Sequence, residues 1–527
     1  QFKNHTDTEV ACAALKEWGV DAFSHMRGMW AMAWVDFKNG AVLFSRDRFG
    51  IKPLYYKRLT NGDFAFSSEA KQLLAVSSEN PRLNRRVAED FLGYGITDHT
   101  AETFFQGVFE LEEGHRFTLN LKSGEATPPA RWYKPALPLT SIPDETYPKV
   151  FQKIFDASLK EHLRSDVTLG SCLSGGLDSS SVVATVYGLR TQQSPPQKTF
   201  SFVPVEEKYS EKKFIDLVLK DKVIESHIVT PGNDDLAQTL AKLVYHQDFP
   251  FASTSIFAQW EVFKAARAAN VKVMLDGQGA DEVLGGYHAF IKIRLYSLFR
   301  SFGLLAFWRQ ARALKSHGYG LFFALQSVFL GLMPVWVEGF IRKLTGKNDG
   351  DRRYFNLSED CANPRSYKAH GIRSIADLSR DQIERSNLPM LLRFEDRNSM
   401  AHGIEARVPF LDHRLVEFAL ATPEHWLISG PYTKNILREA MTDRLPKTIT
   451  HRLDKMGFVT PEEVWMSSGG EPRLQLLREI SAESDGLIKE ALVSDFQRFL
   501  KNEIPYHPAF WRALSFGLWR REFKVVV

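Results

Sequence analysis

The chain has 527 residues, of which 44% are hydrophobic and 25% are charged, which is enough material for a large core and about two to four domains. Lys and Arg number 67 against 63 Asp and Glu, so the net charge of +4 does not indicate a nucleic-acid binder. The three cysteines, Cys12, Cys172 and Cys361, are odd in number and far apart. They argue against a disulfide framework or a CxxC metal site and favour a reducing, cytoplasmic compartment.

The first 127 residues predict an α+β domain with antiparallel sheets. A helix is expected at about 8–18, followed by a β-hairpin whose strands, 32–35 and 42–45, flank the turn signal Phe37-Lys38-Asn39-Gly40. Further short strands are expected near 54–56, 64–66 and 116–119.

A proline-rich segment follows. Six of the chain's 24 prolines lie between Thr127 and Pro148. Because proline removes a backbone donor and resists helix formation, residues 128–148 are interpreted as an inter-domain linker. The second domain is then 149–527.

The second domain shows strands that alternate with helices, which predicts a doubly wound parallel sheet of the α/β class. A helix with apolar residues at helical spacing is expected at 150–159. The expected strands are 167–173, 199–203, 224–229 and 271–275, with helices at 180–186 and 211–219 between them. From about residue 380 onward the sequence favours helices and shows few strand signals.

An insert spans about 290–353. Its segment from Leu321 to Phe340 is the best candidate for a membrane span, but Gln326, Pro334 and Glu338 interrupt it. A span needs about 20 largely uninterrupted apolar residues, so a soluble or surface-lying helical insert is expected instead. The insert is left with three candidate roles: covering the active site, contacting a membrane surface or mediating assembly.

The most informative segment is Leu173-Ser174-Gly175-Gly176-Leu177-Asp178-Ser179-Ser180, which follows a predicted strand and opens a predicted helix. Glycines let the backbone approach an anion, and the free N–H groups at a helix start favour phosphate. Asp178 would repel that phosphate unless a cation lies between them, and Mg²⁺ fits this role. The segment is neither a Walker A loop nor GxGxxG. The alternative is a structural glycine turn.

Two acidic clusters follow. Asp276-Gly277-Gln278-Gly279-Ala280-Asp281-Glu282 ends a predicted strand, where open α/β sheets bind ligands. Asp281 and Glu282 are candidates to complete a Mg²⁺ site with Asp178, and a solvated acidic turn is the alternative. The charged run from Arg393 to Arg397 fits a solvated helix face, although the apolar residues 408–411 indicate packing nearby. Lys434 is a candidate point charge for phosphates.

Together these segments resemble the glutamine-hydrolysing asparagine synthetases of the class B bacterial type. SGGLDSS at 174–180 resembles the pyrophosphate loop of the ATP-pyrophosphatase superfamily. GQGADE at 277–282 and the segment from Asp396-Arg397-Asn398-Ser399-Met400 through EARVPFLD at 405–412 narrow the resemblance to the asparagine synthetase branch. TKNILREA at 433–440 supports it further. Residues 27–33 and 45–56 resemble the family's N-terminal-nucleophile glutaminase domain. The poorest match is the insert.

The resemblance implies that MgATP and aspartate form β-aspartyl-AMP with release of pyrophosphate, and that ammonia then gives asparagine and AMP. It implies that Asp178, Asp281 and Lys434 are catalytic, and that Asp178 and Asp281 bind Mg²⁺. It implies an ATP site made of Cys172, Ser174, Gly175, Gly176, Asp178, Ser179, Phe202, Asp276 and Gly277. In the first domain, Asp7 matches an aspartate that holds the amino group of glutamine.

Two departures from the family pattern matter. The family's nucleophile is an N-terminal cysteine, whereas position 1 here is Gln1, and Cys12 lies in a run that predicts a buried helix face. We therefore expect a glutaminase domain that lacks its N-terminal part, so that nitrogen comes from glutamine in the full-length protein or from ammonia in this chain. The second departure is Gln278, where some relatives have glutamate, because an amide cannot be a general base.

Three alternatives stay open. The substrate could be another carboxylate, such as a uronic acid or a polysaccharide or peptide precursor, or the chain could resemble a β-lactam synthetase or be a non-catalytic remnant. The predicted partners are small molecules, namely aspartate, ATP, and glutamine or ammonia, with no nucleic acid. The sequence leaves the oligomeric state open, with a homodimer as one candidate.

Overall fold

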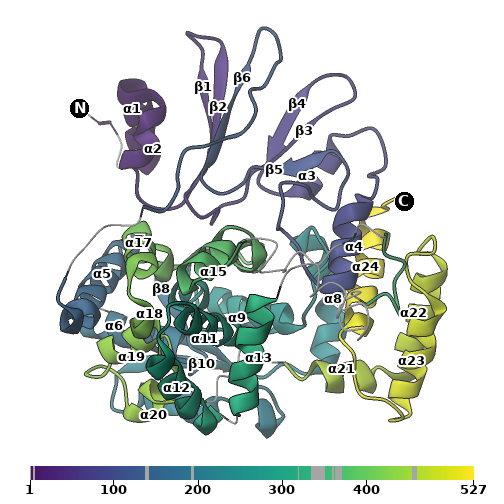
Figure 1. Cartoon of the computed structure of the whole chain (residues 1–527). Coiled ribbons are helices and arrows are strands. Elements are labelled where there is room, and N and C mark those ends of the chain that lie inside the picture. Colours follow the sequence, from purple (N-terminus) through teal and green to yellow (C-terminus); the bar gives the residue numbers. More distant parts are fainter. Residues whose placement is uncertain are drawn as a thin grey trace. The chain divides into compact units, whose positions relative to one another are not determined.

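The computed structural model describes residues 2–3, 6–136, 142–191, 195–317, 320–333, 351–358, 361, 371–453 and 460–527. The chain forms two compact units (Figure 1). The first contains residues 1–84, 100–136 and 526, and the second contains 85–99, 137–525 and 527. Residues 85–99 thus belong to the second unit, whereas the sequence analysis places them in the first domain.

The first unit contains antiparallel sheets, as predicted. Among the described residues, strands β1 (Ala31–Asp36), β2 (Ala41–Arg46), β6 (His115–Asn120) and β7 (Ala130–Arg131) form one sheet in that order. Strands β4 (Phe64–Ser67), β3 (Tyr55–Arg58) and β5 (Val108–Glu110) form the other. The helices are α1 (Asp7–Trp18), α2 (Ala22–His25) and α3 (Ala70–Ala75). The predicted hairpin is confirmed, with Trp34 opposite Leu43.

Aromatic side chains from both sheets form the core of this unit. Phe44 of β2 stacks on Phe117 of β6 at a centroid distance of 4.6 Å, and Tyr56 of β3 lies 5.0 Å from Phe117. On the other face of β2, Leu43 packs with Leu15 of α1 and Phe23 of α2. The alternation of side chains along β2 therefore serves two cores.

The segment 45–56, which carries the resemblance to glutaminases, is fixed by buried charges. The carboxylate of Asp47 accepts the backbone N–H groups of Phe49, Ile51 and Lys52 at 3.0–3.1 Å. Arg46 pairs with Glu110 at 2.9 Å. Burial raises the pKa of Asp47 even though these backbone hydrogen bonds oppose the rise. In this structure the motif organises a turn between β2 and β3.

The predicted linker overlaps the first sheet at its start. Strand β7 lies inside 128–148 and pairs with β6, with Ala130 opposite Arg116. It is an edge strand, where neighbouring prolines remove no ladder hydrogen bond. Residues 137–141, including Pro138, lie outside the described residues. We keep the domain limits as a prediction.

The second unit contains a parallel sheet, which confirms the predicted class. Among the described residues its strand order is β10 (Ile224–Val229), β9 (Gln197–Phe202), β8 (Leu169–Cys172), β11 (Val273–Leu275) and β12 (Glu405–Arg407). From β8 the chain builds outward to one side through β9 and β10, and then to the other side through β11 and β12. The order in which strands are added to the sheet therefore reverses between β8 and β11, and open α/β sheets bind ligands at such a point. A separate antiparallel pair is β13 (Ile428–Ser429) and β14 (Tyr432–Thr433).

Helices surround this sheet (Figure 1). The predicted helix at 150–159 is α5 (Tyr147–His162), where Phe151, Phe155 and Leu159 are fully buried four residues apart. Phe155 stacks on Phe410 at 4.7 Å. The other described helices up to the insert are α4 (Arg85–Tyr94), α6 (Leu177–Leu189), α7 (Lys212–Leu219), α8 (Asn233–Gln247), α9 (Ser255–Ala268), α10 (Ala280–Leu284), α11 (His288–Arg300), α12 (Leu304–Ala313) and α13 (Leu321–Leu332). After the insert come α15 (Ile375–Asp381), α16 (Leu388–Ala401), α17 (His413–Ala421), α18 (Glu424–Leu427), α19 (Asn435–Ala440), α20 (Lys447–Thr450), α21 (Glu462–Ser468), α22 (Gly470–Ala482), α23 (Glu490–Leu500) and α24 (Ala509–Phe523).

The insert is helical where the structure describes it. The candidate span 321–340 begins with α13, which ends at Leu332, and residues 334–350 lie outside the described residues. In the described part of the chain, no helix is long and apolar enough to cross a membrane.

Candidate active site

The loop 174–180 lies between β8 and α6, in the strand–turn–helix arrangement that the sequence predicts. Gly175 has a φ of +81°, and a Cβ atom there would lie 2.9 Å from the Cβ of Phe214. The hydroxyl of Ser179 lies 3.0 Å from that of Ser174 and accepts the Ser174 N–H at 3.1 Å. Asp178 stands in the first turn of α6, next to the N–H groups that a helix start leaves available to an anion.

The two glycine-containing loops meet. A Cβ atom on Gly277 would lie 3.0 Å from both the Cβ of Asp178 and the backbone nitrogen of Ser179. The absence of a side chain at Gly277 therefore allows the loop after β11 to touch the loop after β8. This contact occurs at the point where the strand order reverses.

A cavity of about 400 Å³ opens at this point, entirely within the second unit. Most of the site residues that the family resemblance implies line it: Cys172, Ser174, Gly176, Asp178, Ser179, Phe202, Asp276, Gly277, Asp281 and Lys434. Gly175 is not among the lining residues, because it faces Phe214. Asp7 belongs to the first unit, where it is exposed in the first turn of α1.

Lys434 joins the two predicted metal-binding acids. Its Nζ lies 2.5 Å from Oδ2 of Asp178 and 2.6 Å from Oδ1 of Asp281. Lys434 is 4% exposed, and burial by itself would lower its pKa, but the two carboxylates outweigh burial and raise that pKa. Gly286 gives these side chains room, since a Cβ atom there would overlap Asp281 and the end of Lys434. The ammonium group is thus held charged in the cavity wall.

Glu282 does not join this cluster. Its carboxylate accepts hydrogen bonds from the hydroxyl of Tyr287 at 2.5 Å and from Nδ2 of Asn387 at 2.5 Å. It is buried and is not among the residues that line the cavity. Burial, together with the charge of Asp281, raises its pKa. The expectation that Glu282 completes a metal site is therefore not met in this structure.

A group of buried acids and amides lies beside the cavity. The sequence analysis names Asp276 and Gln278, but it did not predict that they meet Glu395 and Gln259. Asp276 and Gln278 come from the loop after β11, and Glu395 from α16. Glu395 accepts a hydrogen bond from Gln259 of α9 and is hydrogen-bonded to Asp276 and Gln278. Burial, with the charge of Asp276 added, raises the pKa of Glu395 well above its usual range. Hydrogen bonding between the two carboxyl groups, with the raised pKa of both, favours a proton shared between Glu395 and Asp276. Burial also raises the pKa of the Cys172 thiol.

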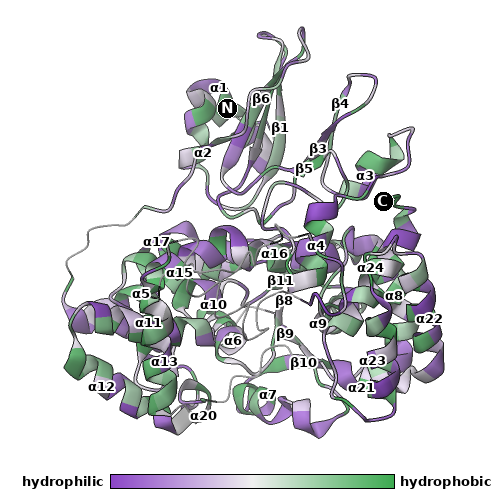
Figure 2. Ribbon diagram, turned by 45° about the vertical axis from the view of Figure 1, so that its right-hand side comes forward, coloured by the Kyte–Doolittle hydropathy of each residue, from purple (hydrophilic) through white to green (hydrophobic). Residues whose placement is uncertain are grey.

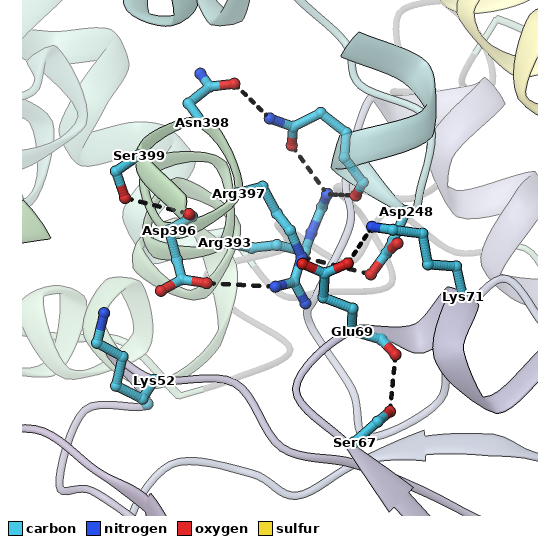
Figure 3. A network of polar contacts seen from close by, with 12 residues as sticks. Lys52, Ser67, Glu69, Lys71, Asp248, Arg393, Asp396, Arg397, Asn398 and Ser399 are labelled. Atoms are coloured by element: carbon cyan, nitrogen blue, oxygen red, sulfur yellow. Dashed lines mark hydrogen bonds and ion pairs between the residues drawn. The ribbon is translucent and has the colours of Figure 1, made fainter. Parts of the chain in front are cut away.

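The charged run on α16 is buried, so the alternative of a solvated face is wrong (Figure 3). Arg393 pairs with Asp98 at 2.8 Å, and its Nη1 donates to the carbonyl of Gln247 at 2.9 Å. The side chain of Gln247 donates to Asn398, which donates to Gln259, both at 2.8 Å. This hydrogen-bonded path leads from Arg393 to Glu395. The sequence contained one signal that this helix face is buried, namely the apolar segment 408–411 that follows it.

Two further basic residues at the cavity were not predicted. Arg452 pairs with Glu211 at 2.6 Å and lies 3.7 Å above the ring of Phe214. Arg438 donates to the carbonyl of Thr450 at 2.8 Å, and burial lowers its pKa. Together with Lys434, these side chains make the cavity suited to an anionic ligand.

Comparison with known proteins supports this view of the second unit. A family model for asparagine synthase matches residues 151–521. The chain belongs to the asparagine synthase family. A model for a glutamine amidotransferase domain matches residues 1–133. The family predicted from the sequence motifs is therefore confirmed, and with it the assignment to the ligases of asparagine biosynthesis.

Named relatives extend over most of the chain. Asparagine synthetase (glutamine-hydrolyzing) 1 of Bacillus subtilis is 27% identical over 98% of this chain and 81% of its own length. Asparagine synthetase (glutamine-hydrolyzing) 2 of the same organism is 28% identical over 86% of this chain, and the match spans 58% of that relative. A protein of Penicillium rubens named Amidase chyE is 25% identical over 93% of this chain.

Substitution of Gly175 is expected to impair both stability and activity. Gly175→Ala places a Cβ in a left-handed conformation and against Phe214, which costs about 1–2 kcal/mol of unfolding free energy. It also shifts the loop backbone, so that ATP-dependent pyrophosphate release should fall at least about tenfold. Urea unfolding and a pyrophosphate assay measure the two effects. The matched control is Gly188→Ala in α6, the helix that follows the loop, where the added methyl meets no atom within 4 Å. Equal behaviour of the two variants would contradict the loop assignment.

The shared proton of Glu395 predicts a pH dependence of stability. The folded protein holds this proton more tightly than the unfolded chain does. The proton therefore contributes fully to the free energy of unfolding below about pH 4.5, and this contribution is lost as pH rises through the raised pKa of Glu395. Glu395→Gln cannot ionise, and we expect a smaller loss of urea resistance between pH 5 and pH 9. Glu490→Gln, at an exposed position of α23, is the control and should reproduce the native slope. A native slope in Glu395→Gln would show that Glu395 is already ionised.

Proposed function

We propose that the chain catalyses the ATP-dependent amidation of aspartate to asparagine through β-aspartyl-AMP, with release of AMP and pyrophosphate. One observation carries this proposal: Asp178 and Asp281 meet Lys434 in a cavity beside the loop 174–180. An adenylating site needs a cation for the phosphates, an anion-binding loop and room for a second substrate, and the cavity supplies residue types suited to each. The names of the Bacillus subtilis relatives favour aspartate as the acceptor.

The reaction has two steps. An oxygen of the aspartate β-carboxylate bonds to the α-phosphorus of ATP, and the bond from that phosphorus to pyrophosphate breaks. The nitrogen of ammonia then bonds to the acyl carbon, and AMP leaves with the former carboxylate oxygen. We propose that backbone N–H groups at the start of α6 hold the departing pyrophosphate, because a helix start leaves such groups available to an anion. Lys434 offsets the negative charge that develops on the phosphates.

Asp178 and Asp281 fit a magnesium ion. Hard carboxylate oxygens suit Mg²⁺, which is usually held by one or two carboxylates, substrate phosphates and water. In the described part of the chain, no group of three or more His, Cys, Asp or Glu side chains is arranged to hold a metal ion. When bound, the ion would neutralise phosphate charge, and Lys434 already shows that these acids hold a cation between them.

The nitrogen source follows from the first unit. The glutamine amidotransferase match supports glutamine as the donor in this family. We propose that Asp7 holds the amino group of glutamine, and that added ammonia replaces glutamine as the donor to the second unit. In a form of the protein that carries the family's N-terminal cysteine, Asp7→Asn should then raise the KM for glutamine and leave the ammonia-dependent reaction unchanged.

A second candidate is the amidation of a different carboxylate. The relative of Penicillium rubens carries the name of an amidase and matches nearly the whole chain. The acceptor is therefore tested directly, by pyrophosphate release from MgATP and ammonium with aspartate, glutamate, a uronic acid or no acid. Release that requires aspartate, with asparagine detected by mass spectrometry, is the expected result. Release of pyrophosphate only with another acid would favour the second candidate. If no acid led to pyrophosphate release, the chain would be a non-catalytic remnant.

A further inference from the structure

Helices α12 and α13 of the insert present apolar side chains to solvent. Both helices pack against α11 and contact each other. In α12, Phe307, Gln310 and Ala311 face inward, and Gln310 donates to the carbonyl of Gly430 at 2.7 Å. The opposite side of α12 exposes Leu305 at 67% and Trp308 at 50%. The helix is therefore anchored on one side and remains apolar on the other.

The second helix, α13, consists mostly of apolar residues, with Gln326 and Ser327 as its polar side chains (Figure 2). Its buried side contains Ala324 and Val328. It docks closely on α11, because Gly331 leaves no space for a Cβ atom beside the ring of Tyr296. Its other side exposes Phe322 at 78% and Phe329 at 62%. Several large apolar side chains exposed on one helix are normally covered, so the outer side of α13 indicates a binding surface.

The turn before α12 adds an exposed aromatic residue. Phe302 is 91% exposed and has a φ of +57°, a conformation that is rare for a bulky residue. The surface formed by Phe302 and the outer sides of α12 and α13 is called the apolar face below.

The helices that form the apolar face carry an excess of positive charge. Residues 283–333 contain six Lys or Arg and no Asp or Glu, although the whole chain is nearly balanced at 67 against 63. Arg294 pairs with Glu424 at 2.7 Å. The other basic residues all have exposed side chains: Lys292, Arg300, Arg309, Arg312 and Lys315. Helices that carry basic but no acidic residues of their own complement an anionic surface better than a protein surface of mixed charge.

The dimensions favour a helix that lies flat on a bilayer. The 12 residues of α13 extend about 18 Å, whereas the hydrocarbon core of a bilayer is about 30 Å thick. A short apolar side, aromatic residues and a Lys/Arg rim are typical of helices that rest at the lipid–water interface. We propose that the apolar face docks the protein on an anionic lipid bilayer as a peripheral membrane surface. This proposal does not depend on the reaction proposed above.

Vesicle flotation of the whole chain tests the proposal. In 50 mM NaCl we expect the protein to float with vesicles of 70% phosphatidylcholine and 30% phosphatidylserine. Binding should be at least tenfold weaker with pure phosphatidylcholine or in 500 mM NaCl, because each exposed basic residue contributes near an anionic surface. The triple variant Leu305→Glu, Phe322→Glu and Phe329→Glu should lose binding at least tenfold. The triple variant Arg309→Glu, Arg312→Glu and Lys315→Glu should lose the preference for phosphatidylserine.

The control variant is Phe37→Glu with Val205→Glu, since both side chains are exposed, at 88% and 71%, outside the insert. It should float like the native protein. Circular dichroism melting shows whether each variant is folded. Flotation of the native protein tests the proposal by itself, so the test does not depend on a variant that fails to fold. Failure of the native protein to float with any vesicle would overturn the proposal. Unchanged flotation of the folded Leu305→Glu, Phe322→Glu and Phe329→Glu variant would also overturn it. The same holds if light scattering shows that the apolar face mediates a dimer and the protein does not bind vesicles.

Discussion

Replacement of Asp178 by asparagine is expected to lower pyrophosphate release from MgATP, aspartate and ammonium by about 10³-fold. The amide keeps the size of the side chain but removes the charge that pairs with Lys434 at 2.5 Å. It also removes one of the two carboxylates proposed to hold magnesium. The loss should appear mainly in kcat, because phosphate charge must be offset most strongly as pyrophosphate leaves.

The control for this variant is Asp216→Asn on α7. Asp216 also pairs with a lysine, Lys212, at 2.7 Å, but both side chains are exposed. Such pairs contribute little, so activity and melting temperature should stay close to the native values. If Asp178→Asn retained more than about a third of native activity, the assignment of the cavity as the adenylating site would be wrong.

Replacement of Lys434 by methionine is expected to have a comparable effect on activity and a second effect on stability. The aliphatic chain still fills the wall, but Asp178 and Asp281 lose the ammonium that both contact. Two carboxylates left together raise the pKa of one of them. The stability that this retained proton provides is present at low pH and is lost as pH rises through the raised pKa.

Magnesium distinguishes this electrostatic role of Lys434 from simple packing. If Asp178 and Asp281 bind Mg²⁺, millimolar Mg²⁺ should restore the melting temperature of Lys434→Met at pH 8 but leave its activity low. Lys447→Met, at an exposed position of α20, should show neither effect. A variant that melts like the native protein at every pH, with or without Mg²⁺, would contradict the proposed cation site.

Local sequence signals were sufficient to locate the cavity. The strand before Ser174, the glycines after it and the helix after Asp178 are contiguous, so short-range patterns predict the loop. The cluster 276–282 also follows a strand directly. The rule that ligands bind where the strand order reverses then brings the two clusters together, as the contact of Gly277 with Asp178 bears out.

The parts of the site that depend on distant contacts were not predictable in the same way. Strand β12 has the sequence Glu-Ala-Arg, which shows no strand pattern. It is a strand because it pairs with β11. Glu395 and Gln259 come from different helices, and only the fold shows that they meet. In a local sequence pattern, the charges of Arg393 and Arg397 predict a solvent-exposed helix face. In the structure both side chains are buried, and each pairs with a buried acid.

Lys434 illustrates both cases. The family resemblance selected it, and its charge suggested a role at phosphates. Its position between Asp178 and Asp281 depends on a left-handed backbone at the start of α19, with a φ of +52°, which no local preference of lysine predicts.

The transfer of oxygen from substrate to nucleotide tests the central claim most directly. The native chain is incubated with MgATP, ammonium and aspartate labelled with ¹⁸O in its β-carboxylate, and the AMP, pyrophosphate and asparagine are examined by mass spectrometry. Attack of the carboxylate on the α-phosphorus predicts one ¹⁸O atom in AMP, one in asparagine and none in pyrophosphate. Production of ADP with labelled phosphate, or of AMP without label in an aspartate-dependent reaction, would contradict the adenylation of aspartate in this cavity.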